Sequence, residues 1–422
     1  MILYFLLVRI AALFGHKKAR KLVKGQASSM GELRDKRESF GAHPIWFHAS
    51  SVGEFEQARP IIEKLKQQHP RKKVVLTFFS PSGYELRKNY KYADLVLYLP
   101  FATRRRAKAF IQLLQPEMAI FVKYEFWPAY LRELQHNGIS TYLISAIFRR
   151  GQLFFLPWGR PYRRLLHCFT RLYVQDEASC RLLQRFGIES VKVAGDTRFD
   201  RVAQVAADAK EIPLIKQFAQ QNGMLEMGLN MQTIVAGSTW PEDELLLARY
   251  MEERPNVKLV LVPHEINETH LHLIFQRYQG NMVRYTEGSQ ANIHSCRVLL
   301  LDTLGMLSSV YRYADVAYIG GGFGAGIHNT LEAAVYGIPV IFGPNYYKFR
   351  EAKGLIAAGG ACSIRKYAEL RDALDAALEH HVEMGAKSKI YVTEEQGATE
   401  MIYHDLFESA QVAVTPEITN EE

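Results

Sequence analysis

Two glutamates lie where a carboxylate can act as a base. Glu54 follows an apolar run, residues 45–48, and Glu125 follows another, Met118–Val122. A carboxylate just beyond a buried strand is suited to take a proton from a hydroxyl group. Structural roles remain open: Glu54 would be favoured by the helix dipole in the first turn of a helix, and Glu125 would be suited to pair with a nearby lysine or arginine.

A glycine-rich segment is the part of the chain best suited to binding an anion. Five glycines lie between Gly320 and Gly326, after the apolar run Val316–Ile319, and helical spacing begins near Asn329. Backbone N–H groups of such a loop, and of the helix start that follows it, bind phosphate or carboxylate. The segment matches no dinucleotide fingerprint well, and an ordinary strand–turn–helix connection is the alternative.

Apolar runs alternate with helical patterns along most of the chain, which predicts parallel sheets with right-handed crossovers. The expected strands are residues 45–48, 73–79, 95–99, 118–122, 141–145, 172–174, 233–236, 258–262, 298–301, 316–319 and 339–342. We expect a membrane-associated helix and basic run at 1–24, a first α/β domain at 25–205 and a linker at 206–230. A second α/β domain is expected at 231–393, followed by a helix that crosses back and a disordered tail at 394–422.

Open α/β sheets bind ligands beyond the carboxyl ends of their strands. In the first domain this rule selects His48, Ser50, Ser51, Gly53, Glu54, Ser80, Ser82, Gly83, Lys123 and Glu125. In the second domain it selects Gly237, Ser238, Thr239, Pro263, His264 and residues 320–329. Two such edges facing across a cleft would form a site for two substrates, one in each domain.

Composition and charge limit the partners that the protein can have. The 422 residues are 48% hydrophobic and 23% charged, as in globular proteins, and carry a net charge of +8. The basic runs favour anionic partners, although each can also be a solvated surface, and they lack the interleaved aromatics of a nucleic-acid binder. Four isolated cysteines suggest a reducing compartment and make a zinc site unlikely.

The first fourteen residues are apolar except for Arg9, and a basic run follows them. The apolar part is shorter than the roughly 20 residues that a membrane-spanning helix needs, and its charges do not follow the order of a signal peptide. We therefore expect an interfacial helix whose lysines and arginines meet anionic lipid, with a buried first helix of the fold as the alternative.

Six motifs in this order resemble those of the Kdo transferases, which move 3-deoxy-D-manno-oct-2-ulosonic acid (Kdo) onto a lipid A precursor. They are HASSVGE (48–54), YEFWP (124–128), AGSTW (236–240), LVPH (261–264), DTLGML (302–307) and GGGFGAGIHNTLEAA (320–334). Each alone is weak, but together they are specific and span nearly the whole chain. Lys123, His264 and Met306 depart from the family pattern, which has Glu, Arg and Glu at these positions in many members.

The resemblance implies an α/β protein with two Rossmann-like domains of the GT-B type. It implies transfer of Kdo from CMP-Kdo to the acceptor with inversion, with Glu54 as the general base and Glu125 as a second catalytic group. Donor-binding residues would be Ser238, Thr239, Pro263, His264, Gly305, Met306, Gly322, His328, Asn329 and Glu332, with packing as the alternative for His328. Acceptor-binding residues would be Ser51, Gly53, Ser80, Ser82, Lys123, Arg104 and Arg105.

No cofactor and no metal are expected, because N–H groups and hydroxyls can hold a single phosphate and no D-x-D box follows a strand. The expected partners are CMP-Kdo, the lipid A precursor and the cytoplasmic face of the inner membrane, where the protein would be peripheral or anchored by its N-terminus. The alternatives are a UDP-sugar transferase or epimerase of the same fold, and a non-catalytic protein that binds the membrane surface.

Overall fold

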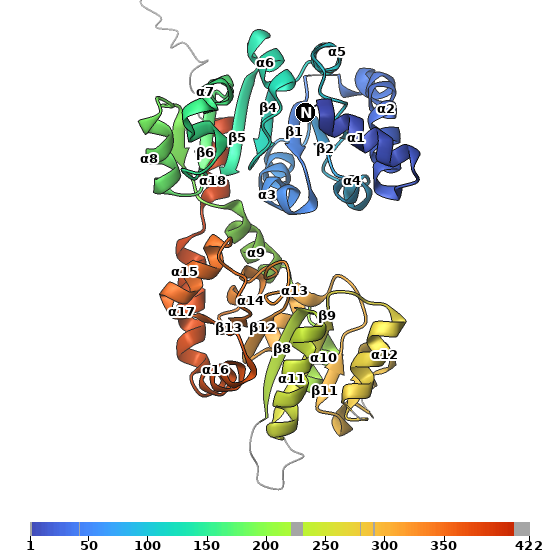
Figure 1. Cartoon of the computed structure of the whole chain (residues 1–422), viewed down its shortest axis with the longest axis vertical. Coiled ribbons are helices and arrows are strands. Elements are labelled where there is room, and N and C mark those ends of the chain that lie inside the picture. The colour runs from blue at the N-terminus through green and yellow to red at the C-terminus, as the bar shows by residue number, and fades with distance from the viewer. Residues whose placement is uncertain (1, 42, 221–230, 279, 290–291, 409–422) are drawn as a thin grey trace, which may run out of the picture. The chain divides into compact units, whose positions relative to one another are not determined.

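The computed structural model describes residues 2–41, 43–220, 231–278, 280–289 and 292–408 (Figure 1). The described chain forms two compact units. The first contains residues up to Arg201 together with the segment that begins at Gln396, and the second extends from Val202 to Glu395. Each unit is built on its own seven-stranded, wholly parallel sheet. The expected α/β fold with two Rossmann-like domains is thus confirmed, and each domain is described by itself.

The first sheet has the strand order β3-β2-β1-β4-β5-β6-β7. Its strands are β1 (Ile45–Ala49), β2 (Val74–Phe78), β3 (Leu95–Tyr98), β4 (Met118–Val122), β5 (Ser140–Ala146), β6 (Arg171–Val174) and β7 (Val191–Val193). The central strands β1, β2 and β4 are buried along their whole length, because helices cover both faces of the sheet. Such strands appear in the sequence as continuous apolar runs, which is why they were predictable.

Two hydrophobic clusters lie on the two faces of this sheet. One contains Trp46 and Phe121 with residues of α5 and α6, and the other contains Phe47 and Ile120 with residues of α3 and α18. The principal helices of this unit are α1 (Ile2–Leu13), α2 (Lys17–Arg37), α3 (Val52–Gln68), α4 (Pro81–Arg87), α5 (Arg104–Leu114), α6 (Pro128–His136), α7 (Arg160–Arg163), α8 (Glu177–Arg185) and α18 (Ala398–Tyr403). Helix α9 (Thr197–Ala207) begins in this unit and ends in the second. Helix α18, near the end of the described chain, packs on the first sheet.

The second sheet has the order β10-β11-β9-β8-β12-β13-β14. Its strands are β8 (Gln232–Thr239), β9 (Val257–Pro263), β10 (Met282–Arg284), β11 (Val298–Leu300), β12 (Val316–Ile319), β13 (Val340–Phe342) and β14 (Ala361–Ser363). The helices are α10 (Pro213–Gln220), α11 (Pro241–Glu253), α12 (Glu268–Arg277), α13 (Leu307–Val310), α14 (Leu331–Ala334), α15 (Arg350–Ala358), α16 (Tyr367–Glu379) and α17 (His381–Glu394).

The structure adds three strands that the sequence did not reveal, namely β7, β10 and β14. Each has three residues, lies at an edge of its sheet and contains a polar or small residue, so its apolar run is too short to stand out. The stretch expected to be a linker contains helix α10, which buries Ile215 and Phe218. Residues 221–230 and the expected disordered tail from 409 lie outside the described residues.

Gly53 is the second residue of α3, because the helix starts immediately beyond Ser51. The helix after the glycine loop is a single turn, Leu331–Ala334, instead of a longer helix from Asn329 through Val335. Gly337, with φ of 73°, allows the left-handed conformation that turns the chain toward β13.

The N-terminal segment forms two helices. α1 ends at Leu13, and the basic run begins the separate helix α2, which buries Ala19 and Leu22. Gln26 of α2 donates a hydrogen bond to the Leu99 carbonyl at 3.0 Å, so this helix is part of the folded domain. Among the described residues, no helix is both long and apolar enough to cross a membrane.

Candidate active site

Glu54 is the third residue of α3, at the carboxyl end of β1. Its Oε2 accepts hydrogen bonds from the backbone N–H groups of Ser50 (2.6 Å) and Ser51 (3.0 Å). Its Oε1 has no hydrogen bond to a described residue. Burial raises the pKa of the Glu54 carboxyl, and the negative charge of Glu125 raises it further; the two N–H groups and His48 act in the opposite direction without cancelling the rise. The carboxylate is therefore fixed in place and has an increased affinity for a proton.

Glu125 follows β4, and its side chain is buried. Its Oε2 accepts hydrogen bonds from His48 Nε2 (3.0 Å) and Trp127 Nε1 (2.6 Å). His48 itself is fully buried in β1, and its Nδ1 lies 2.8 Å from the hydroxyl of Thr77 in β2. The side chain that anchors Glu125 is thus a histidine, where the sequence suggested a lysine or arginine.

The serines after β1 and β2 lie on adjoining loops. Ser80 N–H donates to the Ser50 carbonyl at 2.8 Å, and the Ser80 hydroxyl accepts from Gly83 N–H at the start of α4. Ser80 and Ser82 hydroxyls are 3.2 Å apart, and Ser82 is exposed. Together with Ser51 they line the same edge of the first sheet as Glu54, because β1 and β2 are parallel neighbours in the sheet.

Besides Gln115, which caps the end of α5, three described residues other than glycine have a left-handed backbone, and these three lie at carboxyl ends of strands. They are Lys123 after β4 (φ 56°), Ser145 in β5 (φ 52°) and Ser238 in β8 (φ 54°). Such strain concentrates at functional sites, where the surrounding structure holds it in place. Two of the three, Lys123 and Ser238, were selected from the sequence as substrate-binding residues.

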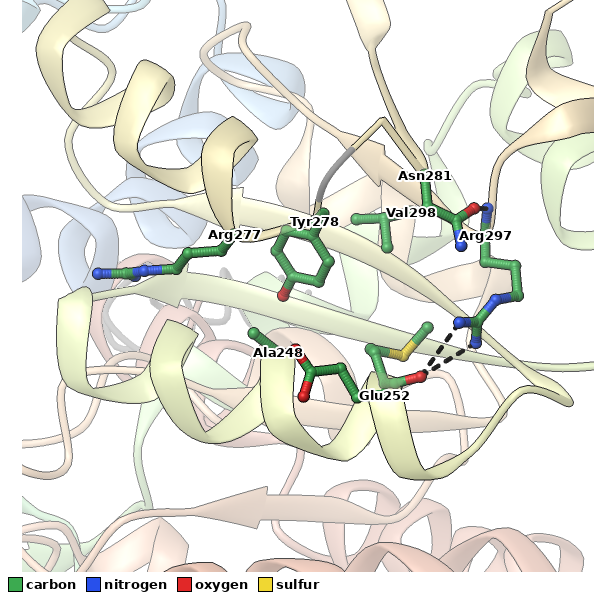
Figure 2. A pocket seen from close by; sticks show the side chains of 8 residues that line it. Ala248, Glu252, Arg277, Tyr278, Asn281, Arg297 and Val298 are labelled. Carbon is green, nitrogen blue, oxygen red and sulfur yellow. Dashed lines mark hydrogen bonds between the residues drawn. The ribbon is translucent and has the colours of Figure 1, made fainter.

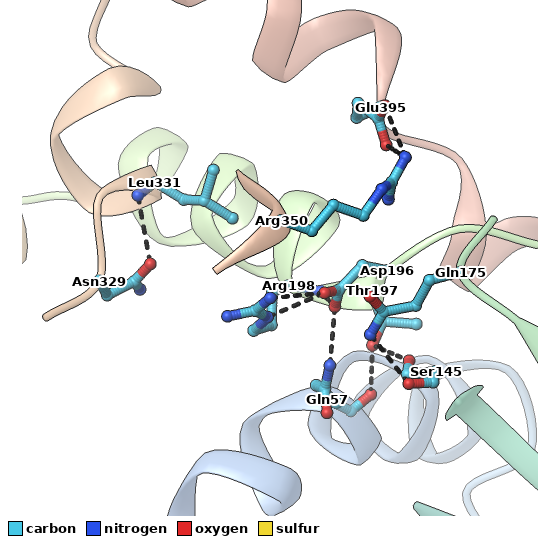
Figure 3. A network of polar contacts seen from close by, with 10 residues as sticks. All are labelled: Gln57, Ser145, Gln175, Asp196, Thr197, Arg198, Asn329, Leu331, Arg350 and Glu395. Carbon is cyan, nitrogen blue, oxygen red and sulfur yellow. Dashed lines mark hydrogen bonds and ion pairs between the residues drawn. The ribbon is translucent and has the colours of Figure 1, made fainter. Parts of the chain in front are cut away.

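A polar network supports this edge of the first sheet beyond Lys123 (Figure 3). Asp196 accepts from Gln57 Nε2 at 2.8 Å and from the Arg198 guanidinium at 2.7 Å. Thr197 hydroxyl lies 3.1 Å from the Ser145 hydroxyl and donates to the Gln57 carbonyl. Burial disfavours the charge of Asp196, but Arg198 and Lys123 outweigh burial and hold the pKa of Asp196 below its usual value. A negative charge therefore persists next to Lys123.

Arg104 and Arg105 begin helix α5 and are exposed. Thr103 caps this helix by accepting a hydrogen bond from Arg106 N–H at 3.3 Å. Positive side chains are unfavourable at a helix N-terminus, where the dipole is already positive. The two arginines therefore present an electropositive surface beyond β3.

The glycine loop of the second domain is packed closely against its own sheet. A side chain at Gly320 would meet the Ser238 carbonyl, and one at Gly322 would meet Gly343. The N–H groups of Gly320, Gly321, Gly324, Gly326 and His328 bond to groups within the domain. The N–H groups of Gly322, Asn329 and Thr330 have no hydrogen bond to a described residue; Gly322 and Thr330 are buried, and Asn329 is half-buried.

The helix after this loop adds little to anion binding, since α14 has four residues and a correspondingly small dipole. The side chains beside it are better defined. Asn329 donates to Glu332 Oε1 at 2.9 Å and accepts from Leu331 N–H (Figure 3). Thr330 is fully buried, and its hydroxyl has no hydrogen-bond partner among the described residues. The sequence analysis did not select Thr330.

Three rings stack at the carboxyl edge of the second sheet. His264 stacks between Trp240 (centroids 4.9 Å apart) and His328 (4.4 Å), and Trp240 Nε1 donates to His328 Nε2 at 3.3 Å. Burial lowers the pKa of His328, and the neighbouring His264 lowers it further, so His328 is neutral at pH 7. This ring stack presents a flat polar surface beside the glycine loop.

Ser238 and Thr239 end strand β8, between the ring stack and helix α11. The Thr239 hydroxyl donates to the fully buried Glu244, which also accepts from His270 at 3.0 Å and from Arg277 at 3.3 Å. Arg277 also lines a cavity of about 410 Å³ beside Tyr278 and Arg297 (Figure 2).

Asp243 is a second buried carboxylate that the sequence analysis missed. It accepts hydrogen bonds from Tyr318 hydroxyl (2.7 Å), Gly321 N–H (3.0 Å) and Trp240 N–H (2.9 Å). Burial raises the pKa of Asp243, although these donors oppose the rise. The carboxylate thus joins the glycine loop to the start of α11.

The remaining residues that the sequence suggested for donor binding have fewer contacts with the glycine loop. Pro263 is the last residue of β9, and Gly305 has φ of 83° in the exposed turn before α13. Met306 sulfur accepts a hydrogen bond from the Thr303 hydroxyl at 3.1 Å. Among the described residues no hydrogen bond joins Gly305 or Met306 to the glycine loop. No cluster of three or more potential metal ligands occurs in the described parts of the chain.

Sequence reasoning found the carboxylates, His48 and the glycine loop, but it missed Thr77, Trp127 and Asp243 and the contact between His48 and Glu125. His48, Thr77 and Trp127 position Glu125, and Asp243 positions the glycine loop. A signal for His48 was present, because a histidine in an otherwise apolar strand needs a buried partner. No local pattern identifies Thr77 as that partner, since the contact depends on the pairing of β1 with β2.

Comparisons with known proteins agree with this architecture. The family model described as "3-Deoxy-D-manno-octulosonic-acid transferase (kdotransferase)" matches residues 12–201. A 3-deoxy-D-manno-octulosonic acid transferase of Bordetella pertussis is 31% identical over 361 residues, which cover 80% of this chain and 79% of the relative. The enzyme of that name from Aquifex aeolicus is 28% identical over 323 residues, or 75% and 80% of the two chains.

Solved structures support the fold. UDP-GlcNAc 2-epimerase from Neisseria meningitidis superposes with a TM-score of 0.59 at 16% identity, covering 86% of this chain and 99% of the epimerase. Two Rossmann-like domains with polar carboxyl edges place the protein in the GT-B class. Within that class, the chain belongs to the 3-deoxy-D-manno-octulosonic acid (Kdo) transferase family. It is a glycosyltransferase of lipopolysaccharide biosynthesis.

Proposed function

We propose that the protein transfers Kdo from CMP-Kdo to a lipid A precursor, lipid IVA, with inversion at the anomeric carbon and with Glu54 as the general base. The observation that carries the proposal is the geometry of Glu54. One carboxylate oxygen is fixed by the N–H groups of Ser50 and Ser51, the other has no hydrogen bond to a described residue, and burial raises the pKa of the carboxyl. A base of this kind is oriented in advance and binds a proton readily.

The step is a direct displacement. An acceptor hydroxyl oxygen forms a bond to the anomeric carbon of Kdo, while the bond from that carbon to the phosphate oxygen breaks and its electron pair leaves with CMP. The hydroxyl proton passes to Glu54. Positive charge develops on the sugar ring during the step, and the nearby negative charges of Glu54 and Glu125 favour it. Glu125 orients the acceptor.

The second domain binds the donor. CMP brings a single phosphate, which the free N–H groups of Gly322 and Asn329 and the Ser238 hydroxyl would hold. The neutral His328 offers a hydrogen-bonding ring without adding charge. Pro263, His264, Thr239, Gly305, Met306 and Glu332 complete the proposed donor site, which needs no metal ion.

The first domain binds the acceptor and the membrane surface in this proposal. Arg104 and Arg105 are exposed and suit the phosphates of the acceptor. In this proposal Ser51, Gly53, Ser80, Ser82 and Lys123 bind the acceptor beside its reacting hydroxyl. Leu13 and Phe14, at the end of α1, are 80% and 87% exposed. Apolar side chains next to a basic helix favour the surface of an anionic bilayer. We propose that the protein acts at the cytoplasmic face of the inner membrane, as a peripheral or N-terminally anchored enzyme.

Donor competition tests this function against a UDP-sugar enzyme. Full-length protein is incubated with CMP-Kdo and lipid A precursor, and CMP or UDP is added at matched concentrations. CMP should inhibit transfer of Kdo, and UDP should inhibit far less, because the proposed site holds one phosphate. Stronger inhibition by UDP, or transfer from a UDP-sugar, would contradict the proposal.

A further inference from the structure

His48 lies at the centre of the first sheet, in β1 between β2 and β4. It is fully buried, and the rings of Phe121 (5.6 Å) and Trp127 (5.9 Å) pack against it edge to face. A buried polar ring in such a strand is costly unless each nitrogen has a partner. Both nitrogens have one: Nδ1 faces Thr77, and Nε2 faces Glu125.

The direction of these hydrogen bonds follows from their chemistry. An ionised carboxylate can only accept, so His48 Nε2 carries a proton and donates it to Glu125. Nδ1 lies 2.8 Å from the Thr77 hydroxyl and 3.1 Å from the Thr77 carbonyl. The Thr77 hydroxyl donates to the Phe47 carbonyl at 3.4 Å and accepts from Trp46 Nε1 at 2.8 Å. These contacts link Trp46 through Thr77 and His48 to Glu125 Oε2.

Glu125 is thereby held as a buried anion next to Glu54. Trp127 donates the second hydrogen bond to the same oxygen at 2.6 Å, and Glu125 Oε1 has no hydrogen bond to a described residue. The ionisable side chains that act most strongly on Glu54 are Glu125 and His48, and the effect of Glu125 is the larger. The other groups packed on His48, namely Thr77, Phe121 and Trp127, do not ionise near neutral pH.

We propose that His48 is a positioning residue that acts through Glu125: its Nε2–H group holds the Glu125 carboxylate, as an anion, beside the base Glu54. The inference rests on the proposed function of Glu54. It assigns to the buried histidine of β1 a role in acceptor activation that the sequence alone does not show. His48 touches neither the acceptor nor the donor in this scheme.

The test uses two substitutions that separate the two ring nitrogens. In His48→Gln the amide N–H reaches about as far as Nε2 and can still donate to Glu125. In His48→Asn the shorter amide reaches only the position of Nδ1, on the side of Thr77, and the hydrogen bond to Glu125 is lost. Kdo transfer is measured in the full-length protein as kcat and kcat/KM against pH, together with melting temperature and CMP affinity.

We expect His48→Asn to lose about 10- to 100-fold in kcat, the range for losing a hydrogen bond to a charged group. The acid limb of its kcat/KM profile should move to lower pH, as in Glu125→Gln, because Glu125, whose charge raises the pKa of Glu54 more than His48 lowers it, is then held less firmly as an anion. In the Glu125→Gln background the same His48→Asn change should move the limb no further. His48→Gln should retain most activity and the wild-type limb, and CMP affinity should hold in all variants.

Two results would overturn the inference. One is a His48→Asn protein whose melting temperature falls while its acid limb stays at the wild-type position, which indicates packing alone. The other is a further limb shift in the Glu125→Gln background, which indicates that His48 does not act through Glu125. If His48→Asn does not fold, Thr77→Val removes the hydroxyl that orients the ring and is read in the same way. Near-normal turnover of Glu54→Gln would instead reject the proposed function itself.

Discussion

Replacing Glu54 with glutamine tests the general base with little change in shape. The glutamine oxygen can still accept the N–H groups of Ser50 and Ser51, which lie 2.6 and 3.0 Å from the native oxygen. The amide cannot take a proton at neutral pH. We expect the rate of Kdo transfer to fall about 10²- to 10⁴-fold, the usual contribution of positioned proton transfer, which equals about 2.7–5.4 kcal/mol. CMP affinity should hardly change, since the proposed nucleotide site lies in the second domain.

Stability should respond in the opposite way to activity. The folded-state pKa of Glu54 is raised, so its contribution to stability is fully present below the unfolded pKa and is lost as pH rises through the folded value. At pH 7 the buried charge therefore lowers the free energy of unfolding. Glu54→Gln should melt at the same or a higher temperature than the wild type at pH 7, and this gain should disappear near pH 4. The hydrogen bonds at the helix start account for only about 0.3–1 kcal/mol.

Glu56→Gln is the matched control, because it makes the same change two residues further along α3. Glu56 pairs with Arg59 (3.3 Å) and Arg87 (2.8 Å) at the surface, so its loss should cost about 0–1 kcal/mol and leave turnover intact. The assays are steady-state transfer, CMP titration and thermal unfolding at two pH values. A Glu54→Gln protein with near-normal turnover would refute the general-base role, and an inactive protein with a much lower melting temperature would indicate a structural role.

A deletion of residues 1–15, which ends between α1 and α2, should shift the protein from membrane to soluble fractions and leave CMP binding intact. High salt should weaken the attachment of the full chain to membranes. A truncated protein that stays on membranes would place the anchor elsewhere. The double substitution Arg104→Gln with Arg105→Gln should raise the KM for the lipid acceptor several-fold. The melting temperature should hold or rise, because two unfavourable charges are removed from the start of α5. An unchanged KM would remove these residues from the acceptor site. Glu244→Ala should lower the free energy of unfolding by about 3–5 kcal/mol, since it leaves Arg277 without its buried partner. A loss below about 1 kcal/mol in chemical denaturation would show that the pair contributes little to stability. Excess chelator should leave transfer close to its untreated rate, and a large loss restored by Mg²⁺ would reject the single-phosphate site.

The sequence predicted what continuous apolar runs and polar edges can reveal. Strands such as β1, β4 and β12 are buried on both faces, so their positions were evident, and the parallel arrangement then brought the polar edge residues of each domain together. The short edge strands β7, β10 and β14 escaped because three residues carry no periodic signal. The single-turn helix α14 was overestimated because helical spacing continues past the residue where the backbone leaves the helix.

The candidate site, like the fold, has features that the sequence could predict and features that it could not. Glu54 was identifiable from its motif, but its raised pKa depends on Glu125, about seventy residues away in the sequence, and on burial. The Thr77–His48–Glu125 contacts depend on the registers of β1 with β2 and β4, which no local pattern specifies. The N-terminus was only partly predictable: the basic run looked continuous with the apolar segment, yet the structure assigns it to α2, which packs into the domain through Ala19 and Leu22.

Direct detection of the product tests the central claim, that this chain transfers Kdo from CMP-Kdo to a lipid A precursor. Purified full-length protein is incubated with CMP-Kdo and tetraacylated precursor, and the lipid is analysed by mass spectrometry, with Glu54→Gln in parallel. We predict a lipid heavier by one or more Kdo residues, release of an equal amount of CMP, and a much slower appearance of both with the variant. An unchanged lipid mass with the wild type, or an equal rate with Glu54→Gln, would contradict this account.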